Sequence, residues 1–396
     1  MDLKKKIEKI QEYLIQQEAD GWLLYDNHGS NRFVRQLLNI SPQQVLTRRF
    51  FYWIPKTGNP QKILHKIESQ NLEQLPGEKY LYLSWQELEQ ALHQVLKKAH
   101  VILMEYSPRC SNPQVSIVDA GLFEILKEMG KQVQSSADVL QSFTSVLGSK
   151  QIASHLEAAS VVQKTVARAW DFISDSVRKQ KRVTEFDVQN FILNDFASQN
   201  CVTEEGPICA VNEHSALPHY MATYEGAKEI QYGDFILIDL WCKKSGQEEV
   251  YADITRVAVA APQPNSKQVE VFEIVKSAQK KAFDFVRERM ELGQTIQGYE
   301  VDDVCRKYIQ IKGYGVFFTH RTGHNIDTSV HGAGANFDHL ETYDQRQLLP
   351  GMCFSVEPGI YLAGEFGVRL ESNMLIQTDR MVKITGGIEE NLLCLL

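Results

Sequence analysis

Single acidic residues interrupt the apolar, strand-like runs in the C-terminal half of this chain. Asp239 and Asp253 lie inside two such runs, and Glu357 and Glu371 close two more. A lone carboxylate loses its hydration when a sheet buries it, so each acid taken alone indicates a strand end or a loop cap. Four carboxylates that fold into one place would repel one another strongly unless cations lie between them. The fold must therefore either leave these acids apart in solvent or bring them together around metal ions.

Histidines gather in the same part of the chain. His320, His324 and His331 fall within a short segment, although the whole chain has only 11 histidines. Taken alone, a histidine that follows glycine in a loop is more often a hydrogen-bonding surface residue than a ligand. An imidazole together with several carboxylates, however, is a ligand set that suits divalent transition metals. The joint occurrence of these residues favours a metal site.

Composition limits the classes of protein to which this chain can belong. A length of 396 residues predicts two domains, and a net charge of −8 disfavours nucleic acid as a partner. The seven cysteines contain no Cys-x-x-Cys pair, which favours a reducing cytoplasm over a disulfide framework. No segment has the pattern of a signal peptide or of a membrane span, so we expect a cytoplasmic protein with no membrane partner.

The pattern of apolar residues changes near residue 148. Before it, short apolar runs alternate with helical segments, which predicts a small α/β domain over residues 1–148. After it, the sequence predicts helices over about 150–180, 184–199, 266–291 and 298–312, the second with Thr184 as its N-cap. The runs between these helices and two Pro-Gly turns predict a mixed antiparallel sheet with flanking helices over residues 149–396. The predicted fold class is therefore α+β, with a smaller α/β domain in front.

Five short phrases in the second half of the chain carry a family resemblance. They read Pro218-His219-Tyr220, Asp253-Ile-Thr-Arg256, His320-Arg-Thr-Gly-His324, Phe354-Ser-Val-Glu-Pro-Gly-Ile-Tyr361 and Phe366-Gly-Val-Arg-Leu-Glu371. In these phrases the chain resembles the metallopeptidases of the pita-bread fold, family M24, which include methionine aminopeptidase, aminopeptidase P and prolidase. The stretch from Val118-Asp-Ala-Gly121 to Ser135-Ser-Ala-Asp138 is more weakly similar to the extra, creatinase-like N-terminal domain of the aminopeptidase P and prolidase branch.

The resemblance implies a centre of two divalent metal ions. Asp239 would chelate one ion, Asp253 and Glu371 would bridge both, and His324 and Glu357 would complete the second site. Oxygen-rich ligation with one imidazole suits Mn²⁺ best, with Co²⁺, Fe²⁺ or Zn²⁺ as alternatives. Four carboxylates and two dications together would leave a neutral centre.

The same resemblance implies roles for further side chains. Glu357 would also carry a proton from the nucleophile to the leaving amine, and His219 and His331 would hold the substrate. His320 is a further candidate for that catalytic role. Arg369 would either contact a substrate carboxylate or brace Glu371, and we favour the brace.

The reaction that the resemblance implies is hydrolysis of Xaa-Pro bonds, at the N-terminus of peptides or in dipeptides. The substrate would be a peptide with proline at the second position, and the protein would form a homodimer. Two alternatives remain at this point. One is an aminopeptidase of other specificity, for example one like methionine aminopeptidase, and the other is a non-catalytic binding protein that retains the fold.

Departures from the family pattern border the expected pocket. The loop between Asp239 and Asp253 is longer than usual and begins with Leu240-Trp-Cys-Lys-Lys244 instead of a small, glycine-containing phrase. Further on, Asn325-Ile-Asp327 replaces Gly-Ile-Gly, and Gly332 stands where an acid is usual. No expected ligand is lost, so these changes bear on substrate preference more than on metal binding.

Overall fold

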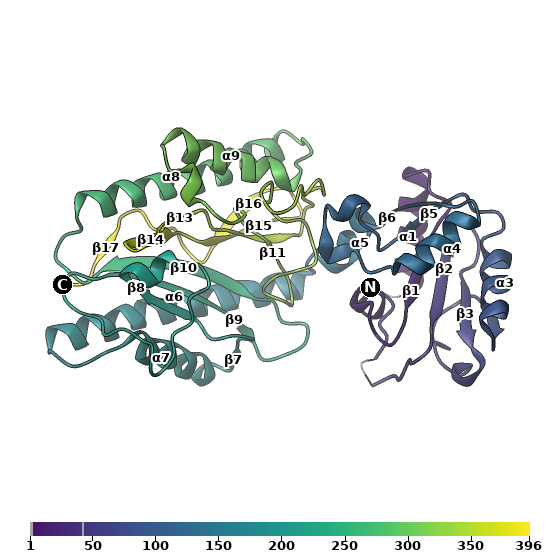
Figure 1. Cartoon of the computed structure of the whole chain (residues 1–396), viewed down its shortest axis with the longest axis horizontal. Helices are drawn as coiled ribbons and strands as arrows, with labels where there is room; N and C mark the ends of the chain where they lie inside the picture. Colours follow the sequence, from purple (N-terminus) through teal and green to yellow (C-terminus); the bar gives the residue numbers. More distant parts are fainter. Residues whose placement is uncertain (1–2, 42) are drawn as a thin grey trace. The chain divides into compact units, whose positions relative to one another are not determined.

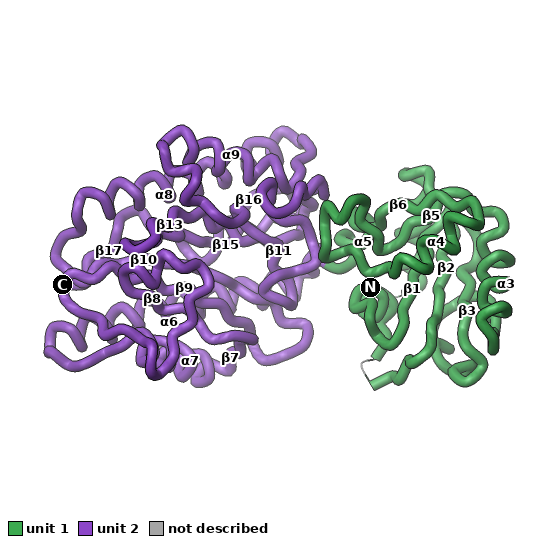
Figure 2. Tube along the Cα trace, viewed as in Figure 1, with its two compact units in different colours: residues 1–144 green, residues 145–396 purple. Residues whose placement is uncertain are grey.

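The computed structural model describes residues 3–41 and 43–396. The chain divides into two compact units, Met1–Thr144 and Ser145–Leu396 (Figure 1; Figure 2). This division lies close to residue 148, where the sequence pattern changes. Each unit has its own sheets and its own hydrophobic core, so each is described by itself.

Unit 1 is built on a six-stranded mixed sheet with the strand order β4-β3-β2-β1-β5-β6. Its strands are β1 Gly21–Asp26, β2 Phe50–Pro55, β3 Gln61–His65, β4 Glu78–Tyr82, β5 Val101–Met104 and β6 Gln132–Ser135. Strand β1 runs antiparallel to β2 and parallel to β5, and all of its residues are buried. The α-helices of this unit are α1 Leu3–Gln16, α2 Arg32–Leu37, α3 Trp85–Val95, α4 Ala120–Glu128 and α5 Ala137–Thr144. Helices and strands alternate, as an α/β unit requires.

Unit 2 contains two larger sheets and a hairpin. In the first sheet the order is β17-β10-β9-β7, and β8 also pairs with β9. The second sheet is antiparallel, with the order β11-β12-β15-β16, and β13 and β14 form the hairpin. The strands are β7 Cys201–Val202, β8 Ile208–Val211, β9 Phe235–Lys244, β10 Ala252–Val259, β11 Asn325–Ile326, β12 Cys353–Val356, β13 Gly359–Leu362, β14 Phe366–Arg369, β15 Ser372–Ile376, β16 Val382–Thr385 and β17 Leu393–Cys394.

Long helices cover the sheets of unit 2 on both sides. They are α6 Ser149–Arg178, α7 Glu185–Ser198, α8 Ser266–Glu291 and α9 Gly298–Ile311. In Figure 1, α8 and α9 lie along one side of the sheets, and α6 and α7 lie along the opposite side. Thr184 caps α7 as predicted, because its hydroxyl accepts the N–H of Asp187. The fold class is α+β, as predicted, and no helix within the described residues combines the length and apolar character that crossing a membrane requires.

The alternation of side chains along β9 and β10 determines where the acids point. On β9, Ile238 packs into the core beside α6 and α7, whereas Leu237 packs into the core beside α8 and α9. Because successive side chains of a strand point to opposite faces, Asp239 lies on the same face as Leu237. On the neighbouring β10, Thr255 is the cross-strand partner of Asp239, and Asp253 shares the face of Thr255. Both acids therefore point away from α6 and α7, toward the second sheet.

Candidate metal centre

One cavity of about 490 Å³ in unit 2 collects the residues that the sequence singled out. Its lining includes all of the predicted ligands, which are Asp239, Asp253, His324, Glu357 and Glu371. The three histidines predicted to meet the substrate also line it, namely His219, His320 and His331. Side chains from both sheets and from the segments between them thus reach one space.

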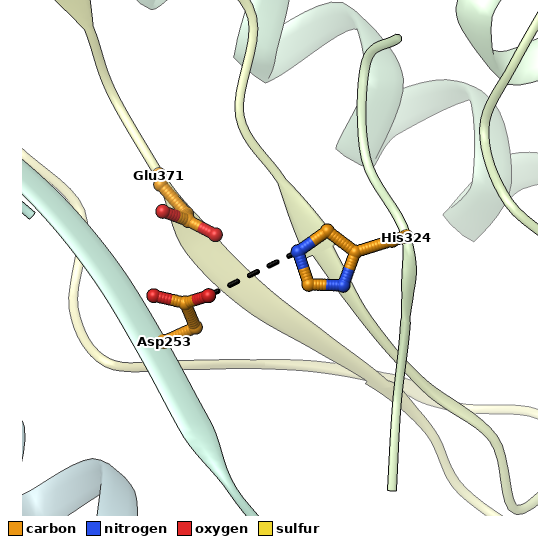
Figure 3. A group of neighbouring side chains, drawn as sticks. All are labelled: Asp253, His324 and Glu371. Carbon is orange, nitrogen blue, oxygen red and sulfur yellow. Dashed lines mark ion pairs between the residues drawn. The ribbon is translucent and has the colours of Figure 1, made fainter. Parts of the chain in front are cut away.

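Three of the predicted ligands form a tight, buried group. The ligand atoms of Asp253, His324 and Glu371 all lie within 4.8 Å of one another. Figure 3 shows the two carboxylates and the imidazole pointing toward one another, with Asp253 of β10 and Glu371 next to each other on one side and His324 on the other. The exposed fraction of each residue is 5% or less. This is the spacing at which one cation can bind all three groups.

Several carboxylate oxygens in the cavity have no hydrogen-bond partner among the described residues. Buried oxygens without one include Asp239 Oδ1, Asp253 Oδ1 and Glu371 Oε1. Burial and the neighbouring carboxylates raise the pKa of Asp253 and that of Glu371 well above their ordinary values. A buried acceptor without a donor is strongly unfavourable, and acids are otherwise seldom fully buried. The donor set therefore fits divalent cations, which would satisfy these oxygens and remove the repulsion.

His324 has the protonation state that a ligand needs. Its Nδ1 lies 3.2 Å from the carbonyl oxygen of Asn325, so Nδ1–H donates to the backbone and Nε2 keeps its lone pair. Nε2 lies 3.3 Å from Glu357 Oε1 and 3.9 Å from Asp253 Oδ2. Burial lowers the pKa of His324 well below its ordinary value, with further repulsion from His331 and Arg321. A neutral imidazole therefore presents its free nitrogen to the acids.

Arg369 braces the centre through Asp239. Its Nη2 lies 2.6 Å from Asp239 Oδ2, and its side chain is buried. Its Nε donates to the hydroxyl of Thr255, which in turn donates to Glu371 Oε2 at 2.8 Å. The predicted brace of Glu371 is therefore indirect, through Thr255, and the direct partner is Asp239. A third bond from Arg369 Nη1 goes to the hydroxyl of Tyr361.

The three histidines differ in whether their ring nitrogens already have hydrogen-bond partners. His320 Nε2 lies 2.7 Å from the Tyr361 hydroxyl and its Nδ1 lies 2.7 Å from the Arg321 carbonyl oxygen. Burial lowers the pKa of His320 to about 3. The ring of His331 lies edge-on to that of His324, with 4.4 Å between centroids. Neither His219 nor His331 forms a hydrogen bond with another described side chain or backbone group, so both are available to a ligand.

Glu357 combines burial with a position next to His324. Its side chain is 15% exposed, and the hydroxyl of Ser355 donates to Oε1 at 3.1 Å. Burial raises the pKa of Glu357 to about 7, against the lowering effects of Arg369 and Arg321. Its carboxyl group can therefore take up and release a proton near neutral pH.

The cavity also contains residues that the sequence reasoning did not assign to it. Arg321, Trp241, Glu204 and Glu205 all line it. The sequence could have pointed to Trp241, because this residue belongs to the phrase that departs from the family pattern. It could not have pointed to Glu204 and Glu205, because the short turn in which they lie has no recognisable pattern.

The structure gives a physical reason for one of the departures. A Cβ atom on Gly332 would lie 2.3 Å from Asn325 Oδ1 and 2.8 Å from Asp327 Oδ2. Asn325 and Asp327 occupy the space that a side chain at position 332 would need. Asn325 and Asp327, which replace the two glycines of Gly-Ile-Gly, thus fit only because position 332 has no side chain.

Comparison with known proteins identifies the family. The model of metallopeptidase family M24 matches residues 153–378, more than half of the chain. An Xaa-Pro dipeptidase of Pyrococcus horikoshii is 31% identical over 267 residues, which are 67% of this chain and 70% of that protein. The crystal structure of a prolidase from Thermococcus sibiricus has a TM-score of 0.66 and 24% identity, and covers 100% of this chain and 99% of its own. An X-prolyl aminopeptidase from Caenorhabditis elegans, described as a cytosolic enzyme with a di-nuclear active site, has a TM-score of 0.65 and 17% identity over 97% of this chain and 62% of its own. The chain therefore belongs to metallopeptidase family M24, as a peptidase in the branch that contains the prolidases.

Proposed function

We propose that this protein is a dinuclear-metal peptidase that hydrolyses Xaa-Pro bonds, at the N-terminus of peptides or in dipeptides. The observation that carries the proposal is a set of three buried carboxylate oxygens that find no hydrogen-bond partner in the described part of the chain, in one cavity with a neutral imidazole. Such oxygens destabilise a fold unless a cation binds them. The substrate is supported by the names of the relatives, which are an Xaa-Pro dipeptidase and a prolidase.

The proposed ligands divide between two ions. Asp239 would hold one ion, Asp253 and Glu371 would be shared, and His324 and Glu357 would hold the other. Two ions agree with the di-nuclear site named for the Caenorhabditis elegans enzyme, and Mn²⁺ is the ion that we propose for this oxygen-rich set. When bound, such ions polarise the scissile carbonyl group and make water a nucleophile near neutral pH.

Glu357 is the proposed proton carrier. The proline nitrogen leaves as a secondary amine and needs a proton at the moment the bond breaks. Glu357 lines the cavity beside His324, where its carboxyl group can accept a proton from the attacking water and pass it to that nitrogen. The hydroxyl of Ser355, which donates to Oε1, orients the carboxyl group for both transfers.

His219 and His331 are the proposed substrate-binding groups. An Xaa-Pro bond has no amide hydrogen, so a pocket that selects it must bind carbonyl oxygens and the ring rather than an N–H group. Both histidines line the cavity and keep their ring nitrogens free of partners among the described residues. Both ring nitrogens of His320 are occupied, which supports a role in positioning Tyr361.

The test compares substrates under metal control. The purified chain is stripped with a chelator, reloaded with Mn²⁺, and offered Xaa-Pro dipeptides, longer Xaa-Pro peptides and Met-Ala peptides. We expect Mn²⁺-dependent cleavage of the proline substrates. Cleavage of the dipeptides alone would indicate a dipeptidase, and cleavage of the longer peptides would indicate an aminopeptidase. Cleavage of Met-Ala peptides alone would favour the specificity of a methionine aminopeptidase, and cleavage of none would refute the proposal.

Assembly and location belong to the same proposal. We propose a homodimer, as the family resemblance implies, and sedimentation velocity that finds only monomer would overturn it. A cytoplasmic site of action is supported by the seven cysteines, which are all free thiols.

A further inference from the structure

Trp241 lines the cavity and carries a hydrogen-bond donor without a partner among the described residues. Its indole is 8% exposed, it lines the same cavity as the predicted ligands, and its Nε1 has no partner among the described residues. A buried donor without an acceptor is unfavourable. A group that enters the cavity and carries an acceptor would remove this cost.

The strand register places Trp241 between the predicted metal ligands and an acidic turn. Across β9 and β10, Trp241 is the partner of Asp253. On the other side of β9, β7 pairs with Lys243 and Lys244, whereas β8 pairs with residues 236–239. Residues 203–207, which join β7 to β8, therefore run alongside residues 240–242. The turn thus lies about 10 Å from β10, two strand spacings of about 4.8 Å away.

Two carboxylates in this turn lack a cation. Glu204 and Glu205 are exposed and line the cavity, and neither forms an ion pair with another residue in the described part of the chain. Arg321 lines the cavity as well, and its positive charge lowers the pKa of Glu357 and that of His331. The side of the cavity beyond Trp241 is therefore acidic.

We infer that Trp241, Glu204 and Glu205 form a subsite for a lysine or arginine side chain on the residue before the scissile bond, an inference that rests on the proposed function. The alkyl stem crosses the indole ring, and the cationic head reaches the two carboxylates. Lysine and arginine combine an apolar stem with a charged end, and a cation near an indole gains further attraction. The indole N–H donates to a carbonyl oxygen of the substrate backbone.

The α-amino group of the substrate is a poor alternative occupant of the acidic turn. It is separated from the scissile carbonyl carbon by one carbon atom, so it stays beside the predicted ligands when that carbonyl is in position to react. Asp239 lies one strand spacing from the β7–β8 connection and Asp253 lies two, so a long side chain reaches Glu204 and Glu205 from a carbonyl group held between these ligands. The geometry therefore assigns Glu204 and Glu205 to side-chain recognition.

The experiment compares lysine with norleucine, which has a similar alkyl stem and no charge. Values of kcat/KM are measured for Lys-Pro and norleucine-Pro dipeptides and for the same pairs extended by alanine, with the Mn²⁺-loaded chain at low salt. We expect about a fivefold to tenfold preference for lysine, the range of one or two exposed ion pairs. In the double variant Glu204→Gln/Glu205→Gln the ratio of kcat/KM for lysine to that for norleucine should fall to about one.

Two further variants separate charge from structure. Glu288 and Glu291 are exposed residues of α8 outside the cavity lining, so Glu288→Gln/Glu291→Gln changes the net charge equally and should keep the lysine preference. Trp241→Phe keeps an aromatic wall and removes the N–H, so KM should rise to a similar degree for lysine and norleucine substrates. An unchanged KM in Trp241→Phe would overturn the role of the indole.

Calorimetric binding distinguishes a failed subsite from a failed function. If no Xaa-Pro peptide is cleaved, binding of Lys-Pro and norleucine-Pro to the Mn²⁺-loaded chain still reports on the subsite. Tighter binding of Lys-Pro that the Glu204→Gln/Glu205→Gln variant abolishes would support the subsite even though the proposed reaction fails. Equal affinity for the two ligands, or a lysine preference that survives in this variant, would overturn the inference.

Discussion

Glu185 is the residue whose replacement tests most directly how the fold holds the substrate-binding loop. It is the first residue of α7 and is fully buried. Its Oε1 accepts the N–H of Val211 at 2.7 Å and lies 2.9 Å from His214 Nδ1. Its Oε2 accepts the Tyr220 hydroxyl at 2.7 Å and the N–H of Lys228 at 2.8 Å. The carboxylate of Glu185 thus forms hydrogen bonds with both ends and the middle of segment 211–228, which carries His219.

The variant Glu185→Gln keeps the shape and replaces one acceptor oxygen with an NH₂ group. Whichever way the amide turns, one backbone N–H, that of Val211 or that of Lys228, then faces a donor, whereas the Tyr220 hydroxyl and the His214 ring can turn to accept. A buried donor left without an acceptor costs about 1–3 kcal/mol, so we expect a loss of about that size. A loss of about 1.4 kcal/mol is about a tenfold increase in local opening.

Native-state hydrogen exchange measures this loss at the backbone amides of Val211 and Lys228. We expect protection to fall at least about tenfold at one of them in Glu185→Gln. The value of kcat/KM should fall as well, since His219 lies in the loosened segment. Glu213→Gln is the matched control, because Glu213 is 45% exposed and pairs only with the Lys228 ammonium group in the same segment. Unchanged protection of both amides in Glu185→Gln would refute the reasoning.

Three other predictions follow from the same structure. Glu357→Gln should retain much of the bound Mn²⁺, measured by elemental analysis. Its kcat should fall at least about 100-fold, as expected when a general acid–base group is lost. A nearly unchanged kcat would exclude Glu357 as the proton carrier. Reloading the chelated protein with Mn²⁺ at about 100 times its Kd should stabilise unit 2 by about 2.7 kcal/mol, seen as a rise in Tm, and a metal-independent Tm would argue against the centre. In unit 1, Glu105 is fully buried and accepts from Trp22 Nε1 at 2.7 Å, and burial raises its pKa. Because the unfolded chain ionises this group at a lower pH than the folded chain does, stability should fall as pH rises above about 4.3, and urea titrations should show a smaller fall in Glu105→Gln.

Local chemistry explains why the long elements could be predicted from the sequence. The predicted helix 266–291 has the bounds that the structure gives to α8, with Asn265 as a capping residue that accepts the N–H of Gln268. Strand β9 could be predicted over part of its length, since Phe235 to Leu240 is an apolar run, but it continues to Lys244. That extension is a tertiary effect, because β7 pairs with Lys243 and Lys244 only after the sheet has formed.

The sequence could predict which residues belong to the candidate site, but not which of them contact one another. The five predicted ligands do line one cavity, and four of them, all but Asp239, stand in the phrases that carry the family resemblance. The partner of Arg369 was predicted as Glu371 and is instead Asp239, at 2.6 Å, because the choice depends on how β14 lies against β9. The Glu204–Glu205 turn reaches the cavity for a similar reason, through pairings of β7 and β8 that no local pattern encodes.

The Arg369–Asp239 pair changes the charge that the sequence predicts for the centre. Four carboxylates and two dications give −4 + 4 = 0, whereas adding Arg369, which is buried against Asp239, gives +1. With a single dication the same sum is −4 + 2 + 1 = −1. A centre with a net positive charge attracts the negative charge that develops on the substrate carbonyl oxygen, and a centre with a net negative charge repels it. Under the proposed function, Arg369 would therefore make two ions the loading at which the electrostatics favour the reaction, a requirement that the ligands alone do not impose.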